Sequence, residues 1–167
     1  MRRVAWVVGL LMLELAVWTP RISHASEGRL PIFGYLETAK ILPQSSPIKA
    51  KLDTGADHSS IHAADIAHSK RNGTLWVRFV IKSDDGRTLK LDRQVIRTAH
   101  IKRPGGKAQA RPVVMMAICI GNLSHEVQVN LVDRSVLNYD LLIGRSFMSG
   151  HLLVDPSQQF TTEPMCE

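Results

Sequence analysis

The residue in this sequence best placed for chemistry is Asp53, which is followed by Thr54 and Gly55. The alternating residues 48–52 predict a strand that ends at Asp53, so the carboxylate would leave that strand at a tight turn. Gly55 has no Cβ and would let a second backbone segment approach closely. A carboxylate in such a turn can act as a general acid or base. An isolated Asp-Thr-Gly also occurs in ordinary turns, so a catalytic interpretation needs a second element.

A second element lies about 90 residues later. Residues 138–145 read Asn-Tyr-Asp-Leu-Leu-Ile-Gly-Arg, an apolar run that ends at a glycine and precedes a short predicted helix. In this order the two elements resemble the retropepsins, the retroviral-type aspartic proteases. The resemblance implies that Asp53 is the catalytic carboxylate, that Thr54 bonds across a dimer axis, and that Gly55 exposes backbone groups to the substrate. It also implies a structural support behind this loop, formed by Ile143, Gly144 and Arg145.

The resemblance is closer to a bacterial branch of this superfamily, whose members are often labelled ATP-dependent zinc proteases. In that branch Lys-x-Asp-Thr-Gly-Ala is followed by Ser-Ser-x-His-Ala, and both stretches occur here, at residues 51–56 and 59–63. Further landmarks match at residues 111–114, 131–135, 142–147 and 153–157. The resemblance extends over about residues 31–160, which is why we rely on it more than on any single motif.

Ala56 and Asp57 follow the catalytic loop directly and are expected to contact the substrate. Asp57 departs from the bacterial branch, which commonly has a basic residue at this position. The retroviral enzymes have an aspartate there and pair it with the arginine after the late glycine. We therefore predict that Asp57 bonds Arg145.

Retropepsins cover the substrate with a flap, a hairpin that carries glycine. Residues 101–107 stand at the corresponding place and would bring Lys102, Gly105 and Gly106 to the peptide. The turn at residues 84–86 is the alternative flap. The basic side chains near residue 105 are compatible with an acidic peptide, although a solvated hairpin tip is the favoured explanation.

The zinc and ATP of the family label find little support in this sequence. A zincin helix needs His-Glu-x-x-His, and residues 58–62 have the two histidines, His58 and His62, without the glutamate. A Gly-x-x-x-x-Gly-Lys-Ser/Thr phosphate loop does not occur either. We expect no metal and no cofactor, and a metal-dependent hydrolase using Asp53 with these histidines is the third-ranked hypothesis.

Aspartic protease chemistry needs two carboxylates that share one proton. The sequence contains one Asp-Thr-Gly, so the hypothesis requires a symmetric homodimer in which each subunit contributes Asp53. We expect an exported aspartic endopeptidase that is active on the acid side of neutral. The alternative is a catalytically silent module of the same fold that binds peptides for a membrane partner.

The positioning elements predicted around these motifs are mostly strands. Alternating apolar residues predict hairpins from residues 75–82 with 88–91 and from residues 113–120 with 127–131, and further strands at 31–36, 48–52 and 152–154. Short helices are expected at residues 63–69 and 145–148. The chain is thus predicted to be all-β, a small closed antiparallel barrel of the retropepsin type with one or two short helices.

The ends of the chain suggest export. Residues 1–25 have a basic start, an apolar run and a Ser-His-Ala end, which is typical of a signal peptide cleaved after Ala25. Residues 26–167 would then form a single domain with 18 basic and 14 acidic side chains, a net charge of +4. This charge is too weak to indicate nucleic acid as a partner. Relatives in the bacterial branch are associated with ATP-grasp peptide or glutamate ligases, which suggests acidic peptide tails as substrates.

The two cysteines, Cys119 and Cys166, would both remain in the exported product. An oxidising compartment allows them to form a disulfide. However, Cys119 lies in an apolar run and Cys166 is the next-to-last residue. A buried Cys119 with an unpaired Cys166 is the simpler expectation, and the sequence leaves the pairing open.

Overall fold

The protein is built almost entirely of β-strands in a computed structural model that describes residues 29–101 and 108–166. In chain order, the elements of these residues are β1 (Ile32–Leu42), β2 (Ser46–Leu52), β3 (Ser59–His62), β4 (Ala64–Arg71), β5 (Thr74–Lys82), β6 (Thr88–Gln94), β7 (Arg97–Ile101), β8 (Gln109–Ile120), β9 (Leu123–Val132), β10 (Leu141–Ile143), α1 (Arg145–Met148) and β11 (Leu153–Gln159). No helix of the described residues is long and apolar enough to cross a bilayer.

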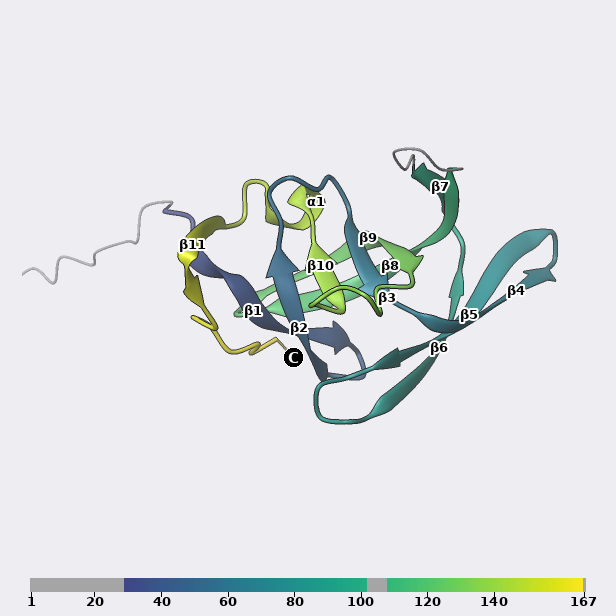
Figure 1. The fold of residues 1–167 in the computed structure, drawn as a ribbon, viewed down its shortest axis with the longest axis horizontal. Helices are drawn as coiled ribbons and strands as arrows, with labels where there is room; N and C mark the ends of the chain where they lie inside the picture. The colour runs from purple at the N-terminus through teal and green to yellow at the C-terminus, as the bar shows by residue number, and fades with distance from the viewer. Residues whose placement is uncertain (1–28, 102–107, 167) are drawn as a thin grey trace, which may run out of the picture.

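Six strands close into a barrel in the order β1–β2–β10–β3–β9–β8, and β8 pairs back onto β1 (Figure 1). The predicted closed all-β barrel is therefore confirmed. Its pairing is mixed, because β10 runs parallel to β2 and β3 runs parallel to β9. Parallel neighbours need a long crossover connection, and the chain between β2 and β10 supplies one that alternation alone could not reveal. Strands β11 and β7 extend the sheet beyond the barrel.

The barrel interior is filled by apolar side chains that alternate with more exposed residues along each strand. In β2, for example, Ile48, Ala50 and Leu52 are buried, whereas Lys49 is exposed. The second sheet, β4–β5–β6, contributes Val77, Phe79, Ile81 and Leu91 to the same hydrophobic cluster. The site therefore rests on one continuous core.

The segment predicted as a helix at residues 63–69 is instead a strand, β4, so that prediction was wrong. Alanine favours helices locally, but β4 pairs with β5 from Ala64↔Val80 to Arg71↔Thr74, with one register shift. Ile66 also packs against the core. Tertiary pairing therefore outweighs the weak helical preference. The helix predicted at residues 145–148 is confirmed as α1.

The C-terminal segment is tied to the barrel by two devices. Cys119 and Cys166 form a disulfide with their Cα atoms 6.0 Å apart, which corrects the expectation of an unpaired Cys166. The fully buried Glu37 accepts hydrogen bonds from the backbone N–H groups of Gly34 and Thr161 at 2.6 and 3.1 Å. Sequence reasoning did not predict the contacts of Glu37, because they depend on the segment after β11 lying against β1.

Candidate active site

Asp53 lies directly after β2 at one end of the barrel. Its backbone N–H donates to the Ile143 carbonyl at 2.9 Å and continues the parallel ladder between β2 and β10. The N–H of Gly55 donates to Oδ1 of Asp53 at 2.9 Å. A Cβ on Gly55 would lie 3.2 Å from the same oxygen, so glycine leaves room for the carboxylate to fold onto the backbone. The side chain of Asp53 is half-buried.

Gly144 allows the loop that follows Asp53 to pack against the end of β10. A Cβ on Gly144 would lie 2.6 Å from the backbone carbonyl carbon of His58, closer than real Cβ atoms approach. The N–H of Gly144 donates to Ser59 Oγ at 3.2 Å. The close approach is steric, because Gly144 has a φ of −94° that any residue can adopt.

Arg145 holds the same loop from the start of α1. Its backbone N–H donates to the Ala56 carbonyl at 2.8 Å, and its Nη1 donates to the Thr54 carbonyl at 2.7 Å. Its guanidinium also forms an ion pair with Asp57. The predicted bond between Asp57 and Arg145 is confirmed. Residues 143–145 thus lie directly behind the Asp-Thr-Gly loop, as the sequence suggested.

Next to this loop is a pocket of about 540 Å³. The loop supplies one wall and the β7–β8 hairpin supplies another, and in Figure 1 both lie toward the same side of the barrel. The lining residues that carry charge or can titrate are Asp57, His58, Arg97, His100, Arg111 and Arg134. A peptide side chain could enter here, next to Ala56 and Asp57 of the loop.

Asp53 and Thr54 themselves line a second pocket, of about 450 Å³. Tyr35 of β1 and Val154 and Pro156 of β11 form its other side. Residues 53–54 and residues 56–57 of this loop therefore face different pockets. Only the part from residue 56 onward belongs to the larger one.

The predicted flap contacts at Lys102, Gly105 and Gly106 lie outside the described residues. The strands that lead to them do line the larger pocket, through residues 97–101 of β7 and Arg111 of β8. This arrangement favours the β7–β8 hairpin as the flap.

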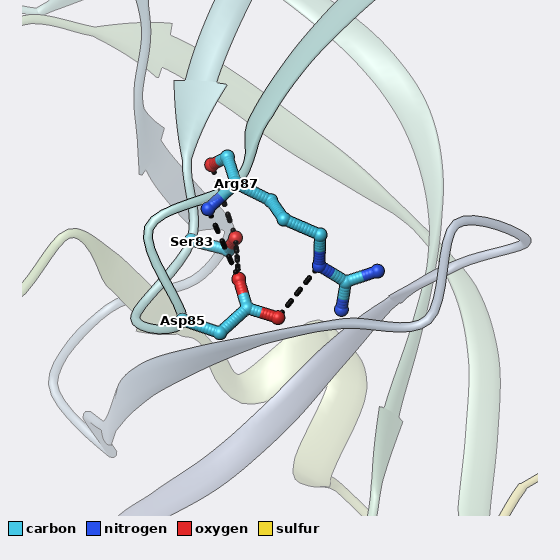
Figure 2. A network of polar contacts seen from close by, with 3 residues as sticks. All are labelled: Ser83, Asp85 and Arg87. Carbon is cyan, nitrogen blue, oxygen red and sulfur yellow. Dashed lines mark hydrogen bonds and ion pairs between the residues drawn. The ribbon is translucent and has the colours of Figure 1, made fainter.

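The alternative flap, the turn between β5 and β6, lies far from Asp53. The N–H of Asp84 donates to the carbonyl of Pro47 at 2.9 Å, near the start of β2, whereas Asp53 follows the end of β2. Figure 2 shows that the polar groups of this turn satisfy one another: Asp85 accepts from Ser83 Oγ at 2.5 Å and from Arg87 Nε at 2.6 Å. The hydrogen bond from the Ser83 hydroxyl holds the pKa of the Asp85 carboxyl below its ordinary value, and Arg87 lowers it to a smaller extent. The place of this turn near the start of β2 does not favour it as the flap.

His58 and His62 do not have the geometry of a zincin helix. His58 lies in the bend before β3 and His62 is the last residue of β3, so the two are not on one face of a helix. Nδ1 of His62 accepts a hydrogen bond from the N–H of Arg134 at 2.9 Å. Within residues 29–101 and 108–166, no three His, Cys, Asp or Glu side chains group closely enough to hold a metal ion.

Arg134 is the main site residue that sequence reasoning missed. It lies after β9, is 7% exposed, and donates to Ser60 Oγ at 3.0 Å and to the Tyr139 carbonyl at 2.9 Å. Burial lowers the pKa of its guanidinium and the charge of Arg111 lowers it further, while two aspartates, Asp140 and Asp53, oppose the shift. The match of residues 131–135 to the bacterial branch could have pointed to Arg134 as a site residue. That motif does not reveal that the arginine is buried.

A family model described as the retropepsin-like aspartic endopeptidase RimB matches residues 32–164. The chain belongs to the RimB-like family. Among solved structures, a Legionella pneumophila protein of unknown function resembles this RimB-like chain with a TM-score of 0.69 and 32% identity, covering 80% of this chain and 98% of that one.

Two curated relatives of this RimB-like chain are named probable alpha-L-glutamate ligase. They come from Shewanella pealeana and Shewanella halifaxensis and are 38% and 39% identical over 116 residues. Each match covers 68% of this chain and 25% of the relative. The RimB-like chain thus spans about a quarter of the length of these curated relatives.

Proposed function

We propose that this protein is an aspartic endopeptidase in which Asp53 of each subunit contributes one carboxylate to a dyad shared by a homodimer. The observation that carries the proposal is the Asp53 loop itself. Its carboxylate is half-buried and held by the Gly55 N–H, and Arg145 supports the loop from behind through Asp57 and Thr54. A peptide-sized pocket adjoins it.

The dyad would work by sharing one proton, because two carboxylates about 3 Å apart cannot both ionise. One Asp53 removes a proton from a water molecule that attacks the peptide carbonyl, and the other donates a proton to the carbonyl oxygen. Activity is therefore expected on the acid side of neutral.

An exposed apolar surface beside Asp53 supports the homodimer. Ile32 and Leu153 are neighbours on β1 and β11 and are 59% and 51% exposed. They adjoin Val154, which shares the second pocket with Asp53. Contiguous exposed apolar side chains commonly mark interaction surfaces, and a two-fold contact here would bring the two loops toward one another.

The substrate proposed is a peptide rich in glutamate. The relatives named probable alpha-L-glutamate ligase contain a segment similar to this chain, and one polypeptide carrying both would join a bond-forming and a bond-cleaving activity for the same peptide. Export to the periplasm or beyond is proposed from residues 1–25, and the Cys119–Cys166 disulfide supports it, because disulfides persist in oxidising compartments.

The test compares the purified protein with Asp53→Asn and with Asp84→Asn, an exposed aspartate on the distant β5–β6 turn. Cleavage of glutamate-rich peptides is followed by mass spectrometry between pH 4 and pH 8, with and without chelator. Activity that survives chelator, is retained in Asp84→Asn and is lost in Asp53→Asn supports the proposal. Loss on chelation would favour a metal-dependent hydrolase, and binding without cleavage would favour the silent peptide-binding module.

The shared dyad has its own test in mixed dimers. Wild type and Asp53→Asn are mixed at equal concentration and allowed to exchange subunits. If both carboxylates are needed, about one quarter of the dimers remain active, whereas independent subunits would retain about one half of the activity. A sedimentation experiment that finds only monomer would contradict the dyad.

A further inference from the structure

Arg134 carries a buried positive charge without an ion-pair partner among the described residues. Its side chain donates hydrogen bonds to the neutral oxygens of Ser60 and Tyr139. Asp140 and Asp53 act on this charge without forming an ion pair with it, and a buried charge is expensive unless a group pairs with it directly. Because Arg134 also lines the larger pocket, the pairing group can come from a ligand.

A second guanidinium lies across the same pocket. Arg111 of β8 lines the pocket with Arg134, and the two charges disfavour one another. The one carboxylate in the described lining, that of Asp57, is already engaged by Arg145. The pocket therefore has an excess of positive charge directly beside the loop that carries Asp53.

Asn130, which lines the same pocket, has a buried side-chain oxygen that lacks a hydrogen-bond donor among the described residues. Its Nδ2 donates to the Ser59 carbonyl at 3.0 Å. Buried polar groups are normally satisfied, so a bound ligand that supplies a donor would complete this site.

We propose that Arg134 and Arg111 form a subsite for a carboxylate side chain of the bound peptide. The inference rests on the proposed function and deepens it by naming the residues that select the substrate. Guanidinium groups bind carboxylates with charge-assisted hydrogen bonds. A carboxylate between the two arginines reduces their mutual repulsion and gives Arg134 its missing partner. An uncharged side chain of the same shape does neither.

The experiment measures binding rather than cleavage, so that it stands apart from the proposed activity. Asp53→Asn protein is titrated by calorimetry with two blocked peptides, acetyl-triglutamate amide and acetyl-triglutamine amide, at neutral pH and low salt. We expect the glutamate peptide to bind about tenfold or more tightly, the usual advantage of a hydrogen bond to a charged group. Equal binding of the two peptides, or no binding of either, overturns the subsite.

Three variants in the Asp53→Asn background assign the preference to residues. Arg134→Gln should bring the glutamate peptide to the affinity of the glutamine peptide and leave the latter unchanged. Arg111→Gln should reduce the preference, and Arg134→Lys should retain part of it. The matched control is Arg78→Gln, which removes an exposed charge on β5, outside the pocket, and should leave the preference intact.

Equal weakening of both peptides in Arg134→Gln would indicate a structural role and overturn the assignment. Thermal unfolding checks that each variant folds. If Arg134→Gln does not fold, an unchanged preference in Arg111→Gln contradicts the subsite and a reduced one supports it. Cleavage by wild type without any preference for glutamate removes the subsite but leaves the proposed function. Selective binding without cleavage removes the proposed function and leaves the subsite.

Discussion

At the scale of single residues, we expect the ion pair between Asp57 and Arg145 to matter more for the position of the Asp53 loop than for stability. Both side chains are substantially exposed, and exposed ion pairs contribute about 0–1 kcal/mol. Yet Arg145 also donates to the Thr54 carbonyl. One guanidinium thereby connects Thr54 and Asp57, on the two sides of Gly55.

Arg145→Lys tests whether Arg145 affects the position of the loop more than the stability of the fold. A lysine keeps the charge but cannot hold both acceptors with a planar fork. We expect the free energy of unfolding to change by less than about 1 kcal/mol, while kcat on a glutamate-rich peptide falls about tenfold or more because the loop is misplaced. Urea unfolding and steady-state kinetics measure the two effects. The control is Arg71→Lys, at the ion pair with Asp92 on β4 and β6, and equal kinetics in both variants would contradict the prediction.

At the scale of elements, the sequence predicted strands better than it predicted their partners. The alternation in β2, β5 and β9 was readable because one face of each strand is buried. Strand β4 was misread because six of its eight residues are exposed and its apolar residues are few. Strands β3 and β10 are three or four residues long, too short for any period to appear. Such elements are defined by the neighbours that pair with them.

The β5–β6 turn permits a pH prediction at this scale. The pKa of Asp85 is lowered in the folded protein, first by the Ser83 hydroxyl. A carboxyl with a lowered folded pKa stabilises the fold above its unfolded pKa, about 3.9, and this contribution is lost as the pH falls through the folded pKa. Asp85→Asn should therefore lower the melting temperature at pH 7, and its difference from wild type should shrink below about pH 4.

Thermal unfolding followed by circular dichroism from pH 2.5 to pH 7 makes this measurement. Asp84→Asn is the matched control, because the neighbouring Asp84 carboxylate makes no hydrogen bond within the described residues. A constant difference between Asp85→Asn and wild type over this pH range would mean that the turn is not stabilised by ionised Asp85.

At the scale of the whole molecule, the C-terminal segment is joined to the barrel by contacts between residues far apart in sequence. The Cys119–Cys166 disulfide spans 47 residues. Lys40 of β1 adds a hydrogen bond from Nζ to the Pro164 carbonyl at 3.0 Å. These contacts hold the chain after β11 against the outer side of the barrel.

Cys166→Ser should lower the free energy of unfolding by about 2–4 kcal/mol, because a cross-link over such a loop restricts the unfolded chain. Urea unfolding under non-reducing conditions measures the loss. Wild type in reductant is the control and should show a similar stability. A variant as stable as the oxidised wild type would show that the bridge contributes nothing.

The all-β class, the place of Asp53 at the end of a strand, and the pairing of Asp57 with Arg145 could be predicted from the sequence, because these features follow from local alternation and from motifs that match a family. The three-dimensional fold was needed to show that residues 64–71 form a strand, that Cys166 meets Cys119, and that Arg134 is buried in the pocket next to the Asp53 loop. Each of these depends on which distant segments become neighbours. Burial and pairing energies arise there, and no short stretch of sequence contains them.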